Sequence, residues 1–334
     1  MKQKVYISPS ASRKLGYPNP YFPRLKQELG AWFDVMEADN RPCRMQAGAL
    51  LKASLKADIF MLSFVETIAF QKLSVLQTCL ALLAMDILRL RGGRLVFFFH
   101  NPAPHKGENR LSRILTKRMF RRACLVVAHS ENTAAIARHR ISADRVLLFP
   151  HPSELPEKVT PSERRADVLI WGTVLPYKGV LEFLNTPGVA DSGLRIDVLG
   201  ACPDASLARQ IHALENGNVR FEERRAPMEE IAARIAASGM VLFPYLPGSI
   251  SGSGTLMDTL RYGGSPVGPD LGAFHDLAQE GLCRVYKNPA ELLEILKSGW
   301  TVDSGLAARY LEKHSWPSFA RELAERLIQR TSRS

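Results

Sequence analysis

Short apolar runs alternate with longer amphipathic segments along the whole chain. Runs rich in β-branched and aromatic residues predict strands in both halves. The predicted strands are Val5–Ile7, Asp58–Phe64, Leu95–His100, Leu125–His129, Val146–Phe149, Val168–Trp171, Ile196–Leu199, Val219–Phe221, Val241–Pro244 and Pro266–Gly268. Between them, stretches such as Ala208–Glu215 and Met228–Ser238 carry apolar residues at helical spacing. This alternation predicts an α/β protein whose parallel sheets are covered by helices on both faces.

The segment His151–Arg165 separates the two groups of strands. It contains three prolines and several charged residues, and its apolar residues follow no period. We therefore predict a linker there, with one doubly wound domain over residues 1–150 and another after it. Because such sheets bind ligands beyond the carboxyl ends of their strands, we expect the site in a cleft where the two sheets face each other.

Composition places the chain among ordinary globular proteins, with 334 residues, 46% of them apolar and 23% charged. Its cysteines never form a C-x-x-C pair, which argues against a disulfide framework or a zinc site and favours free thiols in a reducing cytoplasm. The N-terminus enters a strand-like run rather than a signal sequence. The longest apolar stretch, around residues 78–90, contains Asp86 and Arg89 and is too short to span a bilayer.

Positive charge is concentrated in the first half of the chain. The formal net charge is +11. Residues 1–150 hold 24 basic and 10 acidic side chains, a net +14, whereas residues 151–334 hold 20 and 23, a net −3. Such an asymmetry indicates two surfaces with different partners, and the basic half suits nucleic acid or an anionic membrane.

A basic amphipathic segment covers residues 106–122. Arg110, Arg113, Lys117 and Arg121 fall along one helical face, which suits the surface of an anionic membrane. A solvated helix face with its apolar side in the core explains the same pattern. Nucleic acid is the weaker interpretation, because only Phe120 interleaves with these cations and no nucleic-acid motif occurs elsewhere.

The first candidate for chemistry is WGTVLPYKGVLEFL, residues 171–184. A predicted strand runs into a loop containing Gly172 and Thr173, and Lys178-Gly179 then opens a helix. Backbone N–H groups at the start of a helix attract phosphate, and a lysine nearby adds a full positive charge. The alternative is a surface lysine in an ordinary loop.

The second candidate is a small, glycine-rich loop that precedes the helical run LMDTL. Its members, Ser251, Gly252, Ser253, Gly254 and Thr255, let a backbone approach a ligand closely and offer many donors. Asp258 follows Gly254 by one helical turn and can accept hydrogen bonds from ribose hydroxyls. A flexible loop followed by a surface aspartate is the alternative.

The third candidate is FFFHNPAPH, residues 97–105, in which His100 and Asn101 end a buried strand and His105 follows a turn. His129 and His151 also follow predicted strands in this half. Several histidines at strand ends of one α/β domain indicate a ligand edge, although core histidines are common. Motifs for zinc proteases, Walker-A nucleotide binding, dinucleotide binding and α/β-hydrolases do not occur in the sequence.

Together these segments resemble glycosyltransferases of family 4, especially bacterial enzymes that build capsule, exopolysaccharide or lipopolysaccharide. The matching features are Gly172 with Lys178-Gly179, the turn His100–His105, the segment His129–Glu131, and Pro266-Val267 followed by Leu271–Leu277. The resemblance implies the GT-B fold, with two Rossmann-like domains whose parallel sheets face across a cleft. It implies an acceptor domain over 1–150, a donor domain over 151–305, and helices over 306–334 that cross back to the first domain.

Two departures from the family pattern concern the donor site. Many members have an arginine where this chain has Thr173, and a pair of glutamates where it has Ile250 and Asp258. A related subgroup replaces the first acid with a Ser/Gly loop, so activity is still expected.

The resemblance also implies a mechanism. The enzyme takes sugar from a nucleotide-diphosphate sugar with retention of configuration, without metal or another cofactor. Lys178 neutralises the leaving diphosphate, the amides of Ser251–Thr255 help to hold it, Asp258 contacts ribose and His100 orients the donor sugar. Further candidates for the site are Asn101, His105, His129, Arg224 and Tyr245. The acceptor is a glycan or a lipid-linked saccharide, presented at the inner face of the plasma membrane.

Two other functions remain open at this point. A sugar-nucleotide epimerase has the same scaffold but needs paired acid and base groups around the sugar, and the sequence offers no convincing carboxylate pair. A non-catalytic nucleotide-sugar-binding protein is suggested by Thr173 and Ile250.

Overall fold

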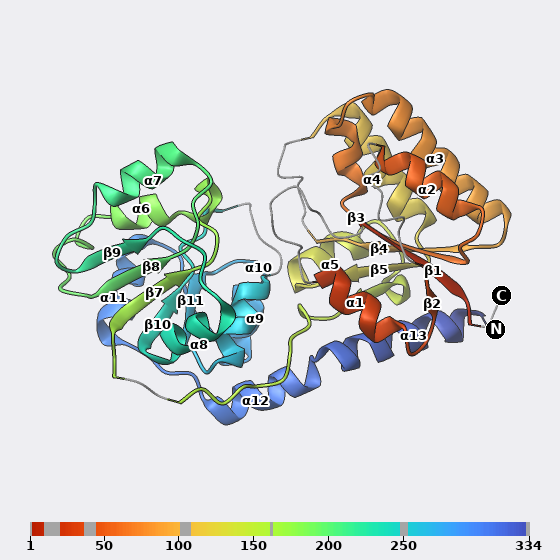
Figure 1. Ribbon diagram of the computed structural model, residues 1–334. Helices are drawn as coiled ribbons and strands as arrows, with labels where there is room; N and C mark the ends of the chain where they lie inside the picture. Colours follow the sequence, from red (N-terminus) through yellow and green to blue (C-terminus); the bar gives the residue numbers. More distant parts are fainter. Residues whose placement is uncertain are drawn as a thin grey trace. The chain divides into compact units, whose positions relative to one another are not determined.

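The computed structural model describes residues 2–9, 21–36, 45–100, 108–160, 163–247 and 253–331. The chain forms two compact units. The first comprises residues 1–150 together with 316–334, and the second comprises residues 151–315. Helix α12 (Ser304–Lys313) therefore lies in the second unit, and the last helix, α13 (Trp316–Thr331), lies in the first (Figure 1).

Within the described residues, the first unit is built on a six-stranded parallel sheet in the order β2-β1-β3-β4-β5-β6. Its strands are β1 (Lys4–Ser8), β2 (Asp34–Val35), β3 (Ile59–Ser63), β4 (Arg94–Phe98), β5 (Leu125–Ala128) and β6 (Val146–Leu148). Successive apolar side chains point to opposite faces and both faces are covered, so the central strands are almost continuously buried.

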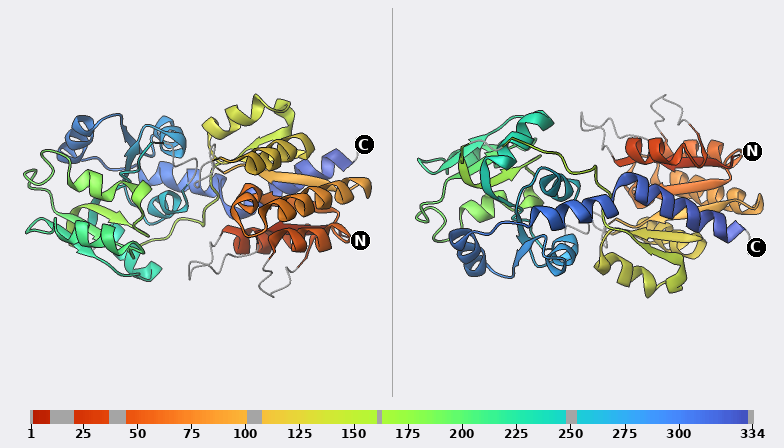
Figure 2. Two further views of the ribbon diagram at one scale, coloured as in Figure 1. Left: turned by 90° about the horizontal axis from the view of Figure 1, so that it is seen from above. Right: turned by 90° about the horizontal axis from the view of Figure 1, so that it is seen from below.

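Helices form a layer on each face of this sheet. One layer consists of α1 (Tyr21–Leu29) and α13, which run side by side as the red and dark-blue helices of Figure 2. The opposite layer consists of α2 (Gln46–Ser54), α3 (Ser74–Leu90), α4 (Arg110–Arg122) and α5 (Glu131–Arg138). Short 3-10 turns, η2 (Val65–Phe70) and η3 (Ala143–Arg145), complete the unit. Helix α13 belongs here because Phe319, Leu323 and Leu327 recur at helical spacing and are completely buried.

The second unit has its own parallel sheet, in the order β12-β11-β10-β7-β8-β9. Its strands are β7 (Ala166–Trp171), β8 (Ile196–Leu199), β9 (Val219–Glu222), β10 (Ser238–Leu242), β11 (Pro266–Pro269) and β12 (Arg284–Tyr286). One face is covered by α6 (Val180–Leu184), α7 (Ala205–His212) and α11 (Pro289–Ser298). The other face is covered by α8 (Met228–Ala236), α9 (Gly254–Arg261), α10 (Gly272–Gln279) and α12.

All the strands predicted from the sequence are present, and the prediction of two parallel α/β units is confirmed. Two strands were missed, β2 and β12. Each has only two or three residues, lies at the edge of its sheet and is partly exposed, so neither produces an apolar run. In the described part of the chain, every helix is too short or too polar to cross a membrane.

Candidate functional site

The sheet of the second unit changes winding direction between β7 and β10. From β7 the chain proceeds to β8 and β9 on one side, and then returns to β10, β11 and β12 on the other. The connections after β7 and β10 therefore diverge at the carboxyl edge of the sheet. Ligands of doubly wound sheets bind at this kind of switch point. Both glycine-containing candidates from the sequence follow one of these two strands.

Gly172, directly after β7, adopts a left-handed conformation with φ 96°. Its carbonyl oxygen lies only 1.9 Å from the position that a Cβ atom would take on Gly200, the residue after β8. Side chains at these positions are therefore excluded by backbone geometry and by contact. Gly200 was missed in the sequence, although a glycine at the end of the neighbouring predicted strand is a usable signal.

Gly179 brings the two diverging connections into contact. It ends the 3-10 turn η4 (Pro176–Lys178) with φ 65°, and a Cβ atom there would lie 2.1 Å from the carbonyl oxygen of Pro244, which follows β10. Beside it, the amide of Leu246 donates to the carbonyl oxygen of Tyr177 at 3.0 Å. This close backbone approach fixes Lys178 against the connection that leads to α9.

Lys178 points back across Gly172. Its Nζ lies 3.5 Å from the Cβ position of Gly172, and Cγ2 of Thr255, in the first turn of α9, lies 3.5 Å from the same position. The ammonium is also 5.6 Å from the ring centroid of Tyr245, a distance that favours a cation–π interaction. Burial lowers the pKa of Lys178, and the neighbouring Tyr177 opposes that shift. The lysine and the start of α9 therefore converge on one point.

Helix α9 presents its N-terminus at this point. The Oγ of Ser253 accepts the amide of Leu256 as an N-cap and lies 2.8 Å from Oγ1 of Thr255. Burial raises the pKa of Tyr245, and hydrogen bonds with Thr255 and Ser253 act against that rise. The indole N–H of Trp171, the last residue of β7, donates to Oγ1 of Thr259 at 3.0 Å and so anchors α9 to the sheet.

His151 lies against the first residue of α9, Gly254, and Asp258 follows that residue by one turn. The Cε1 of His151 is 3.5 Å from the Cβ position of Gly254, and burial lowers the pKa of this histidine to about 4. Burial raises the pKa of Asp258 to about 6, against the attraction of Arg261. A neutral imidazole and a carboxylate that is costly to ionise thus lie next to the proposed anion-binding end of the helix.

Of the other predicted site residues, His100 and His129 lie in the first unit and Arg224 in the second, and others lie outside the described residues. His100 follows β4 and stacks on Phe64, with ring centroids 5.0 Å apart and planes 10° apart. His129 is buried: its Nδ1–H donates to the carbonyl oxygen of Phe149 at 2.7 Å, so its Nε2 accepts the hydroxyl of Tyr21 at 2.7 Å. The remaining predicted positions, Asn101, His105, Ser251 and Gly252, lie outside the described residues, as does Ile250.

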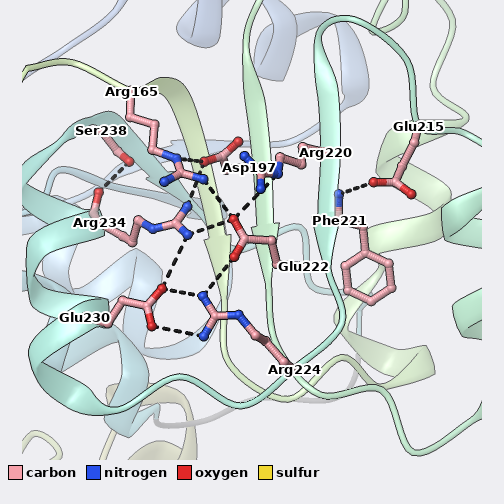
Figure 3. Close-up of polar contacts among 10 residues, drawn as sticks. All are labelled: Arg165, Asp197, Glu215, Arg220, Phe221, Glu222, Arg224, Glu230, Arg234 and Ser238. Atoms are coloured by element: carbon pink, nitrogen blue, oxygen red, sulfur yellow. Dashed lines mark hydrogen bonds and ion pairs between the residues drawn. The ribbon is translucent and has the colours of Figure 1, made fainter.

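Arg224 takes part in an ion-pair network that joins β8 and β9 to α8 (Figure 3). Its guanidinium donates to Glu222 and to both carboxylate oxygens of Glu230, while Arg234 bridges Glu222 and Asp197. Partial burial acts to raise the pKa of Glu222, but the hydrogen bonds from Arg234 and Arg224 outweigh it and hold the pKa at about 2. The carboxylates of Glu222 and Glu230 therefore balance the charge of Arg224.

The structure also shows which side chains of the basic helix α4 are buried and which are exposed. Arg110, Arg113, Lys117 and Arg121 are exposed on α4, whereas Leu115, Met119 and Phe120 are buried in the core. Most of the apolar side of the predicted amphipathic helix is therefore used in packing, although Ile114 is 46% exposed, and the cationic side faces solvent. Among the residues that the structure describes, His, Cys, Asp and Glu side chains form no group of three suited to a metal ion.

No protein-family model matches the chain, and no curated protein matches it in sequence. Several solved structures share its fold. Anabaena HepE in complex with UDP-glucose has a TM-score of 0.73 and 14% identity, covering 98% of this chain and 100% of that one. Sucrose-phosphate synthase from Thermosynechococcus elongatus has a TM-score of 0.70 and 12% identity over 100% of both chains. AviGT4, a glycosyltransferase involved in avilamycin A biosynthesis, has a TM-score of 0.64 and 14% identity over 98% of each chain. The fold is therefore GT-B, as predicted.

Replacing Gly179 tests whether the close approach holds the site together. Gly179→Ala places a Cβ atom against the Pro244 carbonyl and also strains a positive φ. Gly193→Ala is the matched control, because Gly193 has φ 72° and no atom within 4 Å of its Cβ position. We expect the control to lose about 1–2 kcal/mol of unfolding free energy from backbone strain. Gly179→Ala should lose a further ~1–3 kcal/mol from overlap, measured by urea denaturation. Equal losses would contradict the described contact.

Proposed function

We propose that this protein is a glycosyltransferase that moves sugar from a nucleotide-diphosphate sugar to a glycan or lipid-linked saccharide. The observation that carries the proposal is the convergence of Lys178 and the N-terminus of α9 on the same point above Gly172. A diphosphate is the ligand whose charge matches both groups, since helix N-termini and lysines each favour phosphate oxygens. A switch-point location in a GT-B donor unit agrees with this assignment.

In the proposed reaction, the bond between the anomeric carbon and the diphosphate oxygen breaks, and negative charge grows on the diphosphate. An acceptor hydroxyl oxygen bonds to the anomeric carbon, and its proton passes to the leaving diphosphate. The Lys178 ammonium and the first amides of α9 oppose that charge, which stabilises the transition state without a metal ion. Burial helps, because an ion pair is stronger where water is excluded. Asp258 is the proposed partner for ribose hydroxyls, and His100 is the proposed contact for the donor sugar.

Retention of configuration, a role in bacterial surface polysaccharide synthesis and a family 4 assignment are also part of the proposal. They rest on the sequence motifs around Gly172, Lys178 and His100. The solved structure of HepE was obtained with UDP-glucose. UDP is therefore the first nucleotide to test, followed by GDP and ADP and their sugar conjugates. A thermal-shift screen with these compounds tests the proposal directly, and the absence of any stabilisation would contradict it.

We further propose that the enzyme works in the cytoplasm at the inner face of the plasma membrane. The exposed cations of α4 support an anionic surface as partner, and a lipid-linked acceptor is available only there. Turnover with donor and membrane extract separates this function from its alternatives. Epimerised donor in the absence of acceptor would identify an epimerase, and nucleotide binding without turnover would identify a binding protein.

Removing the ammonium of Lys178 should slow transfer. Lys178→Ala is expected to lower kcat by roughly tenfold or more, since a charge-assisted contact to phosphate contributes ~1.5–3 kcal/mol. Lys297→Ala, at an exposed position on α11, is the matched control and should leave kcat unchanged. The measurement is steady-state release of nucleoside diphosphate. Equal rates for the two variants would remove Lys178 from the mechanism.

The pKa of Asp258 gives the proposed ribose contact a pH dependence. Because that pKa is about 6, the carboxylate is ionised above pH 6 and protonated below it. Hydroxyl groups donate more strongly to a carboxylate than to a carboxylic acid. The wild type should therefore bind nucleotide sugar roughly fivefold or more tighter than Asp258→Asn at pH 7.5, and about equally at pH 5. Calorimetric titration of both proteins at the two pH values makes the comparison. A ratio that does not change with pH would argue against this contact.

Removal of divalent metal should leave the reaction intact. If Lys178 and α9 supply the charge that opposes the leaving diphosphate, the rate in excess EDTA should equal the rate in Mg²⁺. The assay uses a protein passed through a chelating resin, with a metal-dependent glycosyltransferase as positive control. Loss of activity that Mg²⁺ restores would overturn the metal-free part of the proposal.

A further inference from the structure

Helix α3 exposes a row of leucines to solvent. Leu76, Leu83 and Leu90 are spaced by seven residues, so they lie almost in line along one side of the helix. Their side chains are 48%, 48% and 86% exposed. Leu73 and Val75, at the N-terminal end of the helix, are also 65% and 64% exposed. We call Leu76, Leu83 and Leu90 the leucine row.

The leucine row is not required for packing within the first unit. The opposite side of α3 supplies Ala81, Ala84, Met85 and Leu88 to the core, and all four are buried. Helix α3 packs between α2 and α4, and its outward face is the one left to solvent (Figure 1). Single exposed leucines are ordinary, but a contiguous apolar row on one helix indicates an interaction surface.

Cations surround the leucine row. Lys52 and Lys56 are exposed on and after α2, and Lys72 and Arg89 are exposed at the two ends of α3. On the other side lies the exposed cationic face of α4. These residues are Arg110, Arg113, Lys117 and Arg121. Asp86, on α3, is neutralised by Arg118 at 2.8 Å and Arg122 at 2.7 Å.

We propose that the leucine row inserts into the headgroup region of an anionic lipid bilayer, with the cations of α2 and α4 binding lipid phosphates. An apolar stripe bordered by lysine and arginine is the composition of helices that lie in the plane of a membrane interface. This membrane contact rests on the proposed function, because only a transferase with a lipid-linked acceptor needs it. It adds to that function the element that enters the bilayer. The exposed face of α4 is mainly cationic, with Ile114 as its exposed large apolar residue, so it mainly supplies attraction.

A second copy of the chain fits this surface less well. Two leucine rows packed against each other would bring the lysines of α2 and the arginines of α4 close to like charges of the partner. Charged residues are depleted at the centre of protein interfaces, and like charges there repel. A bilayer of anionic lipids instead offers opposite charge on both sides of the row.

Vesicle sedimentation tests the proposal with the full-length protein. We expect binding to vesicles of 70% phosphatidylcholine and 30% phosphatidylglycerol, and at least about tenfold weaker binding to pure phosphatidylcholine. Leu83→Gln/Leu90→Gln should weaken binding to the anionic vesicles at least about tenfold. The matched control is Leu155→Gln/Ile328→Gln, which replaces leucine and isoleucine side chains that are 58% and 46% exposed elsewhere. Equal binding by the two double variants would overturn insertion of the row.

Cys79 provides a direct probe of insertion because it is exposed one turn after Leu76. A polarity-sensitive dye on Cys79, in a protein carrying Cys43→Ser and Cys124→Ser, should shift to the blue on anionic vesicles. An unchanged spectrum with vesicle-bound protein would show that the row stays in water and would overturn the proposal.

Sedimentation velocity tests whether a second copy of the chain, rather than a membrane, binds the leucine row. A dimer that Leu83→Gln/Leu90→Gln converts to monomer, with vesicle binding unaltered, would assign the row to a second copy instead. Nucleotide binding by the wild-type protein keeps the two proposals separate. Vesicle binding without nucleotide binding would contradict the proposed glycosyl transfer, whereas nucleotide binding without vesicle binding would contradict the membrane surface and the proposed membrane location.

Discussion

The approach of Gly179 to the Pro244 carbonyl is the contact on which the site depends. At 2.1 Å from a hypothetical Cβ, the backbone of one connection occupies space that any larger residue would need. The positive φ of Gly179 turns the chain from η4 into α6, and this turn carries Lys178 back over Gly172. Without the contact, the connections after β7 and β10 would diverge as the topology directs, and the lysine would not meet α9.

Burial in the second unit disfavours the charged forms of two groups that the proposed nucleotide would contact, Lys178 and Asp258. Burial disfavours the charged form of Lys178 and lowers its pKa, and burial likewise raises the pKa of Asp258 to about 6. Because the pKa of Asp258 in the folded protein exceeds its ordinary value of 3.8, ionising it as pH rises toward neutrality costs stability. A diphosphate beside the lysine and hydroxyl donors beside the aspartate would recover both costs. Shifts in pKa of this kind are typical of ligand-binding and catalytic sites.

The sequence was sufficient to predict the sheets, because buried parallel strands appear as continuous apolar runs. It also selected Gly172, Lys178 and Thr255 as candidates because they follow predicted strands, and the structure brings these three residues together. It could not show that Lys178 and α9 meet over one glycine, which depends on a contact between residues 65 positions apart along the chain, Gly179 and Pro244. Nor could it separate His129, whose two ring nitrogens are satisfied within the core, from His100.

The exposure of the leucines on helix α3 is another feature that could not be predicted from the sequence. In the sequence, residues 78–90 are simply the most apolar stretch, and a buried helix explains them. The structure shows that Ala81, Ala84, Met85 and Leu88 provide the buried side, whereas Leu76, Leu83 and Leu90 are left to solvent. Large apolar side chains are usually buried, so three exposed leucines on one side of a helix indicate an interaction surface. The cations of α2 and α4 are exposed beside that row, and a membrane interface is the surrounding in which both features lower the free energy.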